Sequence, residues 1–225
     1  VELEERLAAW MGFEKALCFT TGYLSNQGAI SSLGGRHDTI FSDKENHACI
    51  VDATRLSFAE IKRYAHGDMD DLERQLADTS EDSGRLIVTD GVFSMRGTIV
   101  DLPRMVELKK KYGARIYIDD AHGLGVLGEK GRGTGEHFGL HDDVDVIMGT
   151  FSKSFAGLGG FVVGEERVLL LLRQLQVGEI VGERDRLGVG QLFGCCGFDL
   201  FECLGGCELF RDFELFRGRI VDERL

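Results

Sequence analysis

The chain has 225 residues, of which 43% are hydrophobic, and a formal net charge of −12. This length and apolar content predict one large globular domain, and the acidic charge argues against nucleic acid or an anionic membrane as the main partner. No stretch approaches the ~20 apolar residues of a membrane helix, and the first residues do not resemble a signal peptide, so we expect a cytoplasmic protein without a transmembrane segment.

Helices and strands are predicted to alternate along most of the chain. Amphipathic or capped patterns predict helices over residues 3–10, 24–33, 48–57, 69–77 and 102–112, with Asp68 as the N-cap of the fourth helix and Gly113 as the residue that ends the fifth. Apolar runs predict strands over residues 15–20, 39–42, 61–65, 85–89, 115–120 and 144–148. The first helix begins in mid-pattern, so we expect the natural chain to start earlier. The alternation predicts an α/β fold with a mainly parallel central sheet and helices on both faces.

The last predicted strand delivers one lysine into a glycine-rich turn. An alternating apolar run ends in small and hydroxylated residues, and Lys153 follows between Ser152 and Ser154. A lysine amine held on a rigid element can form a Schiff base with a carbonyl group, and small neighbours leave room for a planar ligand. Lys153 is therefore the candidate nucleophile, with a solvated surface lysine as the plain alternative.

Other polar residues fall at or just past predicted strand ends. In parallel sheets ligands bind at the carboxyl ends of the strands, so we expect these side chains to converge. The turn Thr21-Gly22-Tyr23 leads from a strand into a helix, an arrangement that offers backbone amides and a helix dipole to an anion. The converging residues are Asp90, Ser94, Asp119, His122, Thr150 and Lys153.

These residues meet the needs of pyridoxal phosphate. That cofactor requires a phosphate anchor, a carboxylate at the ring nitrogen, a donor to the phenolic oxygen and a stacking ring. The candidates are, in that order, Gly22 and Tyr23 with Thr150, then Asp119, His122 and His47. Each side chain alone could equally be a helix cap or an ordinary hydrogen-bonded residue, and it is their joint presence that favours the cofactor.

Metal sites are not favoured. His137 and His141 with Asp142 have a possible ligand spacing, but Gly139 and the loop-like context favour a solvated loop. The spacing of the late cysteines matches no common zinc pattern; these residues are Cys195, Cys196, Cys203 and Cys207. Cys18 and Cys49 lie in apolar stretches typical of buried free thiols. The chain also lacks the Walker and dinucleotide-binding glycine motifs.

Five segments carry a family resemblance. They are Thr21-Gly22-Tyr23 with Asn26, Asn46-His47-Ala48, residues 89–95, Asp119-Asp120-Ala121-His122-Gly123 and residues 149–154. Together they resemble the α-oxoamine synthases, a group of fold-type-I pyridoxal-phosphate enzymes, in order over about residues 1–168. Within this family, residues 131–140 and 147–154 are most similar to serine palmitoyltransferase, with 8-amino-7-oxononanoate synthase and 2-amino-3-ketobutyrate CoA ligase next.

The resemblance implies a decarboxylative condensation of an amino acid, with serine favoured, and an acyl-CoA. It implies a homodimer with a shared active site, in which Lys153 forms the Schiff base and moves the α-proton while His47 stacks on the ring. The other implied contacts are Asp119 at the ring nitrogen, His122 at the phenolic oxygen, Gly22, Tyr23 and Thr150 at the phosphate, and Ala121 and Ser94 beside the ring. Asp90 stands where the family usually has the longer glutamate, so no direct Asp90 contact is carried over.

The resemblance stops near Val168. Lys153 is the last lysine, and the proline-containing segment and C-terminal arginine of the family have no counterpart here. We therefore expect residues 1–168 to be the cofactor-binding core, N-terminally truncated, and residues 169–225 to be an atypical tail, frameshifted or misassembled. The alternatives are an aminotransferase of the same fold, an inactive partner subunit, and a fragment that does not fold stably. The sequence does not select the amino acid or the acyl chain.

Overall fold

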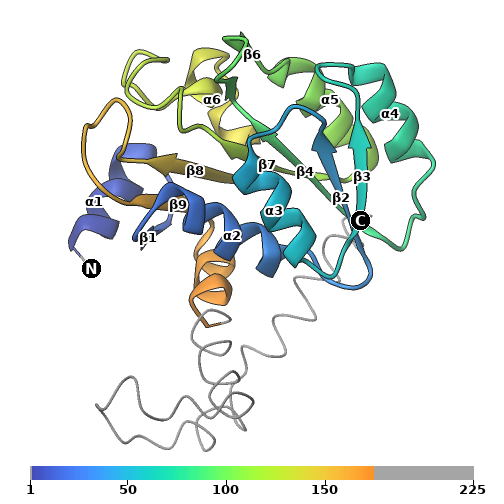
Figure 1. The fold of residues 1–225 in the computed structure, drawn as a ribbon, viewed down its shortest axis with the longest axis horizontal. Helices are drawn as coiled ribbons and strands as arrows, with labels where there is room; N and C mark the ends of the chain where they lie inside the picture. Colours follow the sequence, from blue (N-terminus) through green and yellow to red (C-terminus); the bar gives the residue numbers. More distant parts are fainter. Residues whose placement is uncertain (1, 175–225) are drawn as a thin grey trace, which may run out of the picture.

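The structure is a computed structural model that describes residues 2–174, and its centre is a seven-stranded sheet (Figure 1). Its strands are, in chain order, β1 (Lys15–Phe19), β2 (Asp38–Asp43), β3 (Glu60–Tyr64), β4 (Gly84–Asp90), β7 (Arg115–Asp119), β8 (Val146–Thr150) and β9 (Gly160–Gly164). A separate hairpin pairs β5 (Val92–Phe93) with β6 (Thr98–Ile99). The helices are α1 (Glu2–Met11), α2 (Gly22–Leu33), α3 (Ala48–Leu56), α4 (Met69–Ala77), α5 (Leu102–Tyr112), α6 (Thr134–His137) and the short 3-10 helix η1 (His141–Asp143). Residues 166–174 are also helical.

The sheet is parallel over most of its width. The strand order is β1-β9-β8-β7-β4-β2-β3, and the pairs from β8 across to β3 are all parallel. Strand β9 instead runs antiparallel to both of its neighbours, β8 and β1. The predicted mainly parallel α/β fold is therefore confirmed. The carboxyl ends of β4, β7 and β8 lie next to one another, which is where polar residues were expected to converge.

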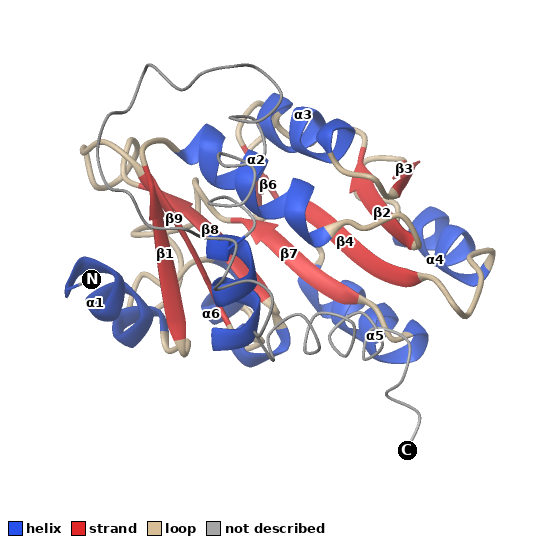
Figure 2. Ribbon diagram, turned by 90° about the horizontal axis from the view of Figure 1, so that it is seen from below, coloured by secondary structure: helices blue, strands red, loops and turns tan. Residues whose placement is uncertain are grey.

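Strand residues alternate between two apolar cores. In β4, Ile87 packs in one core while its neighbours Leu86 and Val88 pack in the other, as the alternation of side chains along a strand requires. Helices α1, α4 and α5 cover the first core, whereas α2, α3 and the helix over residues 166–174 cover the second (Figure 2). With helices on both faces, the central strands are buried on both sides.

Local sequence features explain where several helices begin and end. Asp68 caps α4 by accepting a hydrogen bond from the backbone N–H of Asp71, as predicted. Gly113 ends α5 in the left-handed conformation, with φ of 62°, which glycine adopts without steric cost. Strand β9 and the β5–β6 hairpin were not predicted.

Two expectations concern regions at the limit of the described chain. Most of the proposed atypical tail, from residue 175 onward, lies outside the described residues, including the four late cysteines. Val168, Leu169 and Leu172 are buried against the second core, so the ordered packing continues a few residues past the point where the family resemblance stops. Within residues 2–174, no helix combines the length and apolarity needed to cross a bilayer.

Candidate active site

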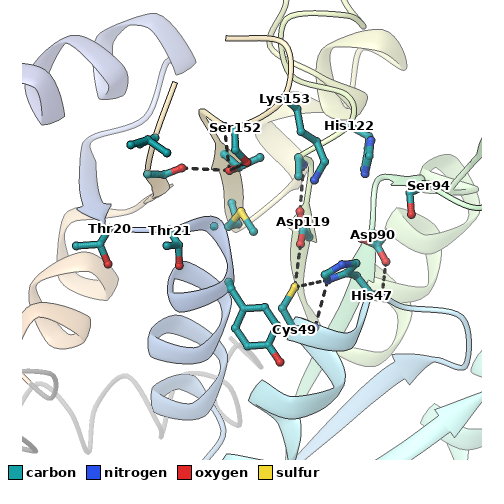
Figure 3. A pocket seen from close by; sticks show the side chains of 17 residues that line it. Thr20, Thr21, His47, Cys49, Asp90, Ser94, Asp119, His122, Ser152 and Lys153 are labelled. Carbon is teal, nitrogen blue, oxygen red and sulfur yellow. Dashed lines mark hydrogen bonds between the residues drawn. The ribbon is translucent and has the colours of Figure 1, made fainter. Parts of the chain in front are cut away.

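A cavity of about 320 Å³ opens at the carboxyl ends of β4, β7 and β8, beside the first turns of α2 and α3 (Figure 3). This volume is large enough for a small-molecule ligand. All nine residues expected to contact a cofactor line it: Gly22, Tyr23, His47, Ser94, Asp119, Ala121, His122, Thr150 and Lys153. The expected convergence at strand ends is therefore what the fold produces, although their roles toward a cofactor stay proposals.

The first turn of α2 lies against the end of β8. Thr21 caps the helix by accepting a hydrogen bond from the backbone N–H of Leu24 at 3.1 Å. Gly22 permits the close approach, because a Cβ at this position would lie 2.8 Å from Oγ1 of Thr150. The free amides of the helix start and the Thr150 hydroxyl thus border one end of the cavity, an arrangement that suits an anion.

Asp119 lies at the end of β7 and is only 3% exposed. Its Oδ1 accepts a hydrogen bond from the backbone N–H of Ala121 at 3.0 Å, and its Oδ2 accepts one from Nδ2 of Asn26 at 2.6 Å. The thiol of Cys49 is a more distant donor to the same Oδ2, at 3.8 Å. A buried carboxylate with both oxygens hydrogen-bonded has a fixed orientation, so Asp119 is prepared to face a cationic group in the cavity.

His47 stands at the start of α3. Its backbone N–H donates to Oδ2 of Asp90 at 2.7 Å, and its Nδ1 accepts from the backbone N–H of Cys49 at 3.2 Å. These bonds hold the imidazole at the cavity wall, in a position where a ring could stack. Burial, together with the nearby Asp119, raises the pKa of the Asp90 carboxyl. Asp90 also lines the cavity, so the shorter side chain still reaches the site.

Lys153 belongs to the loop between β8 and β9. Figure 3 shows its side chain pointing into the cavity near His122 and Asp119. The backbone of this loop is held by hydrogen bonds from Ala156 N to Lys153 O at 3.0 Å and from Ser154 Oγ to Leu124 O at 2.7 Å. Burial and the positive charge of Lys153 lower the pKa of His122. Lys153 is solvent-exposed, yet it borders the cavity rather than an open surface.

Three residues at the site, Asn26, Cys49 and Asp120, received no role from the sequence, although Asn26 and Asp120 belong to the segments that carry the family resemblance. Asn26 and Cys49 contact Asp119 directly, and Asp120 accepts hydrogen bonds from both the backbone N–H and the hydroxyl of Thr134, each at 2.6 Å. Asn26 lies four residues after Gly22, so the helical spacing could have placed it on the cavity side. No feature of the sequence predicts the hydrogen bonds between Asp120 and Thr134, which lie 14 residues apart.

The histidines considered as metal ligands lie apart from this cavity. His137 is exposed at the end of α6, and Nε2 of His141 lies 2.5 Å from the carbonyl oxygen of Met11. His141 also packs edge-on against Phe13. It is therefore a packing residue, which differs from the solvated loop expected for it. Residues 2–174 contain no group of three or more metal-ligating side chains placed to share an ion.

Comparison with known proteins identifies the family. A model described as aminotransferase class I and II matches residues 1–183. The chain belongs to this family. Over 173 residues it is 53% identical to a serine palmitoyltransferase of Bacteroides thetaiotaomicron, which covers 77% of this chain and 44% of that protein. Over 170 residues it is 52% identical to an 8-amino-7-oxononanoate synthase of Geobacter sulfurreducens, with 76% and 44% covered.

A solved structure gives the same result. A serine palmitoyltransferase determined with pyridoxal phosphate superposes with a TM-score of 0.74 at 39% identity, covering 77% of this chain and 44% of that one. These matches confirm the resemblance to α-oxoamine synthases and the fold-type-I architecture. The chain spans less than half the length of these relatives.

Proposed function

We propose that the chain binds pyridoxal phosphate through Lys153 and acts as an α-oxoamine synthase, which joins the acyl group of an acyl-CoA to the α-carbon of an amino acid and releases coenzyme A and carbon dioxide. Serine is the favoured amino acid, because serine palmitoyltransferases are among the most similar relatives. The observation that carries the proposal is the convergence of Gly22, Asp119 and Lys153 on one cavity.

The residues present fit this cofactor. The absence of a side chain at Gly22 lets the start of α2 lie against Thr150, so that the helix amides and the Thr150 hydroxyl together form an anion cradle that can hold a phosphate. Asp119 is a buried carboxylate suited to a protonated ring nitrogen. The side chain of Lys153 points into the same cavity, near Asp119 and His122 (Figure 3). An anion cradle, a carboxylate and an amine on one cavity match the three chemically distinct parts of the cofactor.

Each residue then has a defined task. When bound, the protonated cofactor ring would draw electron density from the α-carbon of the amino acid. Lys153 would hold the cofactor and carry the α-proton, and Asp119 would keep the ring nitrogen protonated. The supporting roles are stacking by His47, packing by Ala121 on the opposite face, a hydrogen bond from His122 to the phenolic oxygen, and lining by Ser94.

Assembly and location are further parts of this proposal. The acyl-CoA channel and the grip on the substrate carboxylate would come largely from the second subunit of the expected homodimer and from the parts of the relatives that this chain does not span. Residues 2–174 support the proposal by assembling the cofactor end of the site from one chain. The cytoplasmic location stays a prediction from the sequence.

The first test is covalent labelling. The purified chain would be incubated with pyridoxal phosphate, reduced with borohydride and mapped by mass spectrometry, beside Lys153→Ala and, as a matched surface lysine, Lys130→Ala. We expect one labelled peptide, containing Lys153, that is absent only in Lys153→Ala. Labelling spread over many lysines in a folded sample would contradict the assignment of the site.

The second test is turnover. Coenzyme A release would be measured with palmitoyl-CoA and each of a panel of amino acids, and we expect serine to give the highest rate and Lys153→Ala to give none. Conversion of the cofactor to pyridoxamine phosphate without consumption of acyl-CoA would indicate an aminotransferase instead. Labelling without any turnover would restrict the function of this chain to cofactor binding.

A further inference from the structure

We propose that Asn26 is the positioning residue for Asp119, so that α2 fixes both the phosphate end and the ring end of the site. This inference rests on the proposed function, because it concerns how the chain holds pyridoxal phosphate. Asn26 would not touch the cofactor. It would act through the carboxylate that faces the ring.

The hydrogen-bond partners of Asn26 allow only one orientation of its side-chain amide. It is fully buried, its Nδ2 lies 2.6 Å from Oδ2 of Asp119, and its Oδ1 lies 2.9 Å from the hydroxyl of Tyr117. An ionised carboxylate only accepts hydrogen bonds, so the amide must turn its N–H toward Asp119 and its oxygen toward Tyr117. The Tyr117 hydroxyl is then the donor. It fixes the amide, and the amide fixes the carboxylate.

Asp119 is thereby held from two independent elements. The backbone N–H of Ala121 binds Oδ1 from the loop after β7, whereas Asn26 binds Oδ2 from α2. Nδ2 of Asn26 also donates to Sγ of Cys49 at 3.0 Å, and this thiol is itself only a distant donor to Asp119, at 3.8 Å. With Asn26 removed, the one strong hydrogen bond left on Asp119 would not prevent rotation about its terminal torsion, which is intrinsically soft.

Because Asn26 lies on α2, its contact with Asp119 links the ring end of the site to the phosphate end. Asn26 follows Gly22 by four residues, so the two lie one above the other on the same face of the helix. Gly22 borders Thr150 at the anion cradle, and Asn26 reaches the ring carboxylate. One rigid helix therefore sets the spacing between the two anchoring points.

The test separates the ring end from the phosphate end. Full-length chains carrying Asn26→Leu, Tyr117→Phe or Ile30→Val would be titrated with pyridoxal phosphate by visible absorbance and then competed with inorganic phosphate. Ile30 is a matched control, because it is equally buried on α2 but packs in the apolar core. We expect Asn26→Leu to weaken cofactor binding about tenfold or more and Tyr117→Phe about threefold, since each removes a buried hydrogen bond. Competition by inorganic phosphate should stay within twofold of the wild type in all three.

Different outcomes overturn different statements. Cofactor binding by Asn26→Leu within twofold of the wild type would overturn the inference alone. A parallel loss of phosphate competition would also overturn it, because it would mean that the variant disturbs α2 as a whole. If Asn26→Leu does not fold, unchanged cofactor binding by Tyr117→Phe would be decisive against it. Absence of cofactor binding by the wild type would overturn the proposed function and the inference with it.

Discussion

The close contact between α2 and β8 makes Gly22→Ala a sharp test of the anion cradle. The new Cβ would lie 2.8 Å from Oγ1 and 2.9 Å from Cβ of Thr150. Both distances are too short for van der Waals contact, and Thr150 Cβ cannot move without its strand. The first turn of α2 must therefore shift away from β8, and its amides must move with it.

The expected cost follows from two effects. Overpacking of this kind destabilises a fold by about 1–3 kcal/mol, which for a chain of this size lowers the melting temperature by several degrees. A misplaced amide also loses a charge-assisted hydrogen bond to the phosphate, worth about 1.5–3 kcal/mol. That loss corresponds to an affinity for pyridoxal phosphate weaker by roughly 10- to 100-fold.

The assay is a pair of titrations on each variant, with urea for stability and with pyridoxal phosphate for binding. Leu24→Ala is the matched control, since Leu24 lies in the same helical turn but is 45% exposed and does not line the cavity. We expect the control to bind the cofactor like the wild type. Equal affinity in Gly22→Ala and the wild type, or an equal loss in Leu24→Ala, would refute the assignment of the cradle to this turn.

Two further predictions concern Asp120 and Ala156. Burial raises the pKa of Asp120 from 3.8 to about 6, so the folded state binds more protons than the unfolded state in this interval, and the contribution of Asp120 to stability is lost as pH rises from about 4 to 6. This pKa shift corresponds to about 3 kcal/mol in the free energy of unfolding. When urea unfolding is measured at several pH values between about 4 and 6, the free energy of unfolding should fall less with pH in Asp120→Asn than in the wild type. An identical fall in both proteins would contradict this. Ala156 has φ of 50°, which costs a side chain roughly 1–2 kcal/mol, so Ala156→Val should destabilise the chain by at least about 1 kcal/mol in urea while Ala156→Gly should not. Equal stability of the two variants would show that this backbone conformation is not maintained.

The sequence allowed much of the site to be predicted because the relevant information is periodic and local. Apolar runs located the strands, and in a parallel sheet the strand ends must share one edge, so Asp119 and Lys153 were expected near each other before any contact was known. The caps at Asp68 and Gly113 were predicted for the same reason, since each acts on its own helix.

Features that depend on distant partners were not predictable in this way. Asn26 binds Asp119 across 93 positions of the chain, and neither residue type indicates the other. Strand β9 begins inside a glycine-rich segment, and its antiparallel course follows from its partners β8 and β1 rather than from its own pattern. Such contacts are set by tertiary packing, which periodicity in one segment does not encode.

Strand β9 is nevertheless essential to the geometry of the cradle. A Cβ at Gly160, its first residue, would lie 2.5 Å from Oγ of Ser25 and 2.8 Å from Cα of Gly22. The backbone of β9 therefore approaches the first turns of α2 as closely as the end of β8 does. Glycines on both sides of this contact bring the helix start down onto two adjacent strands, one ending and one beginning at the same edge. The anion cradle is thus a product of the antiparallel return as much as of the parallel sheet, and the helix that it seats also carries Asn26 to Asp119.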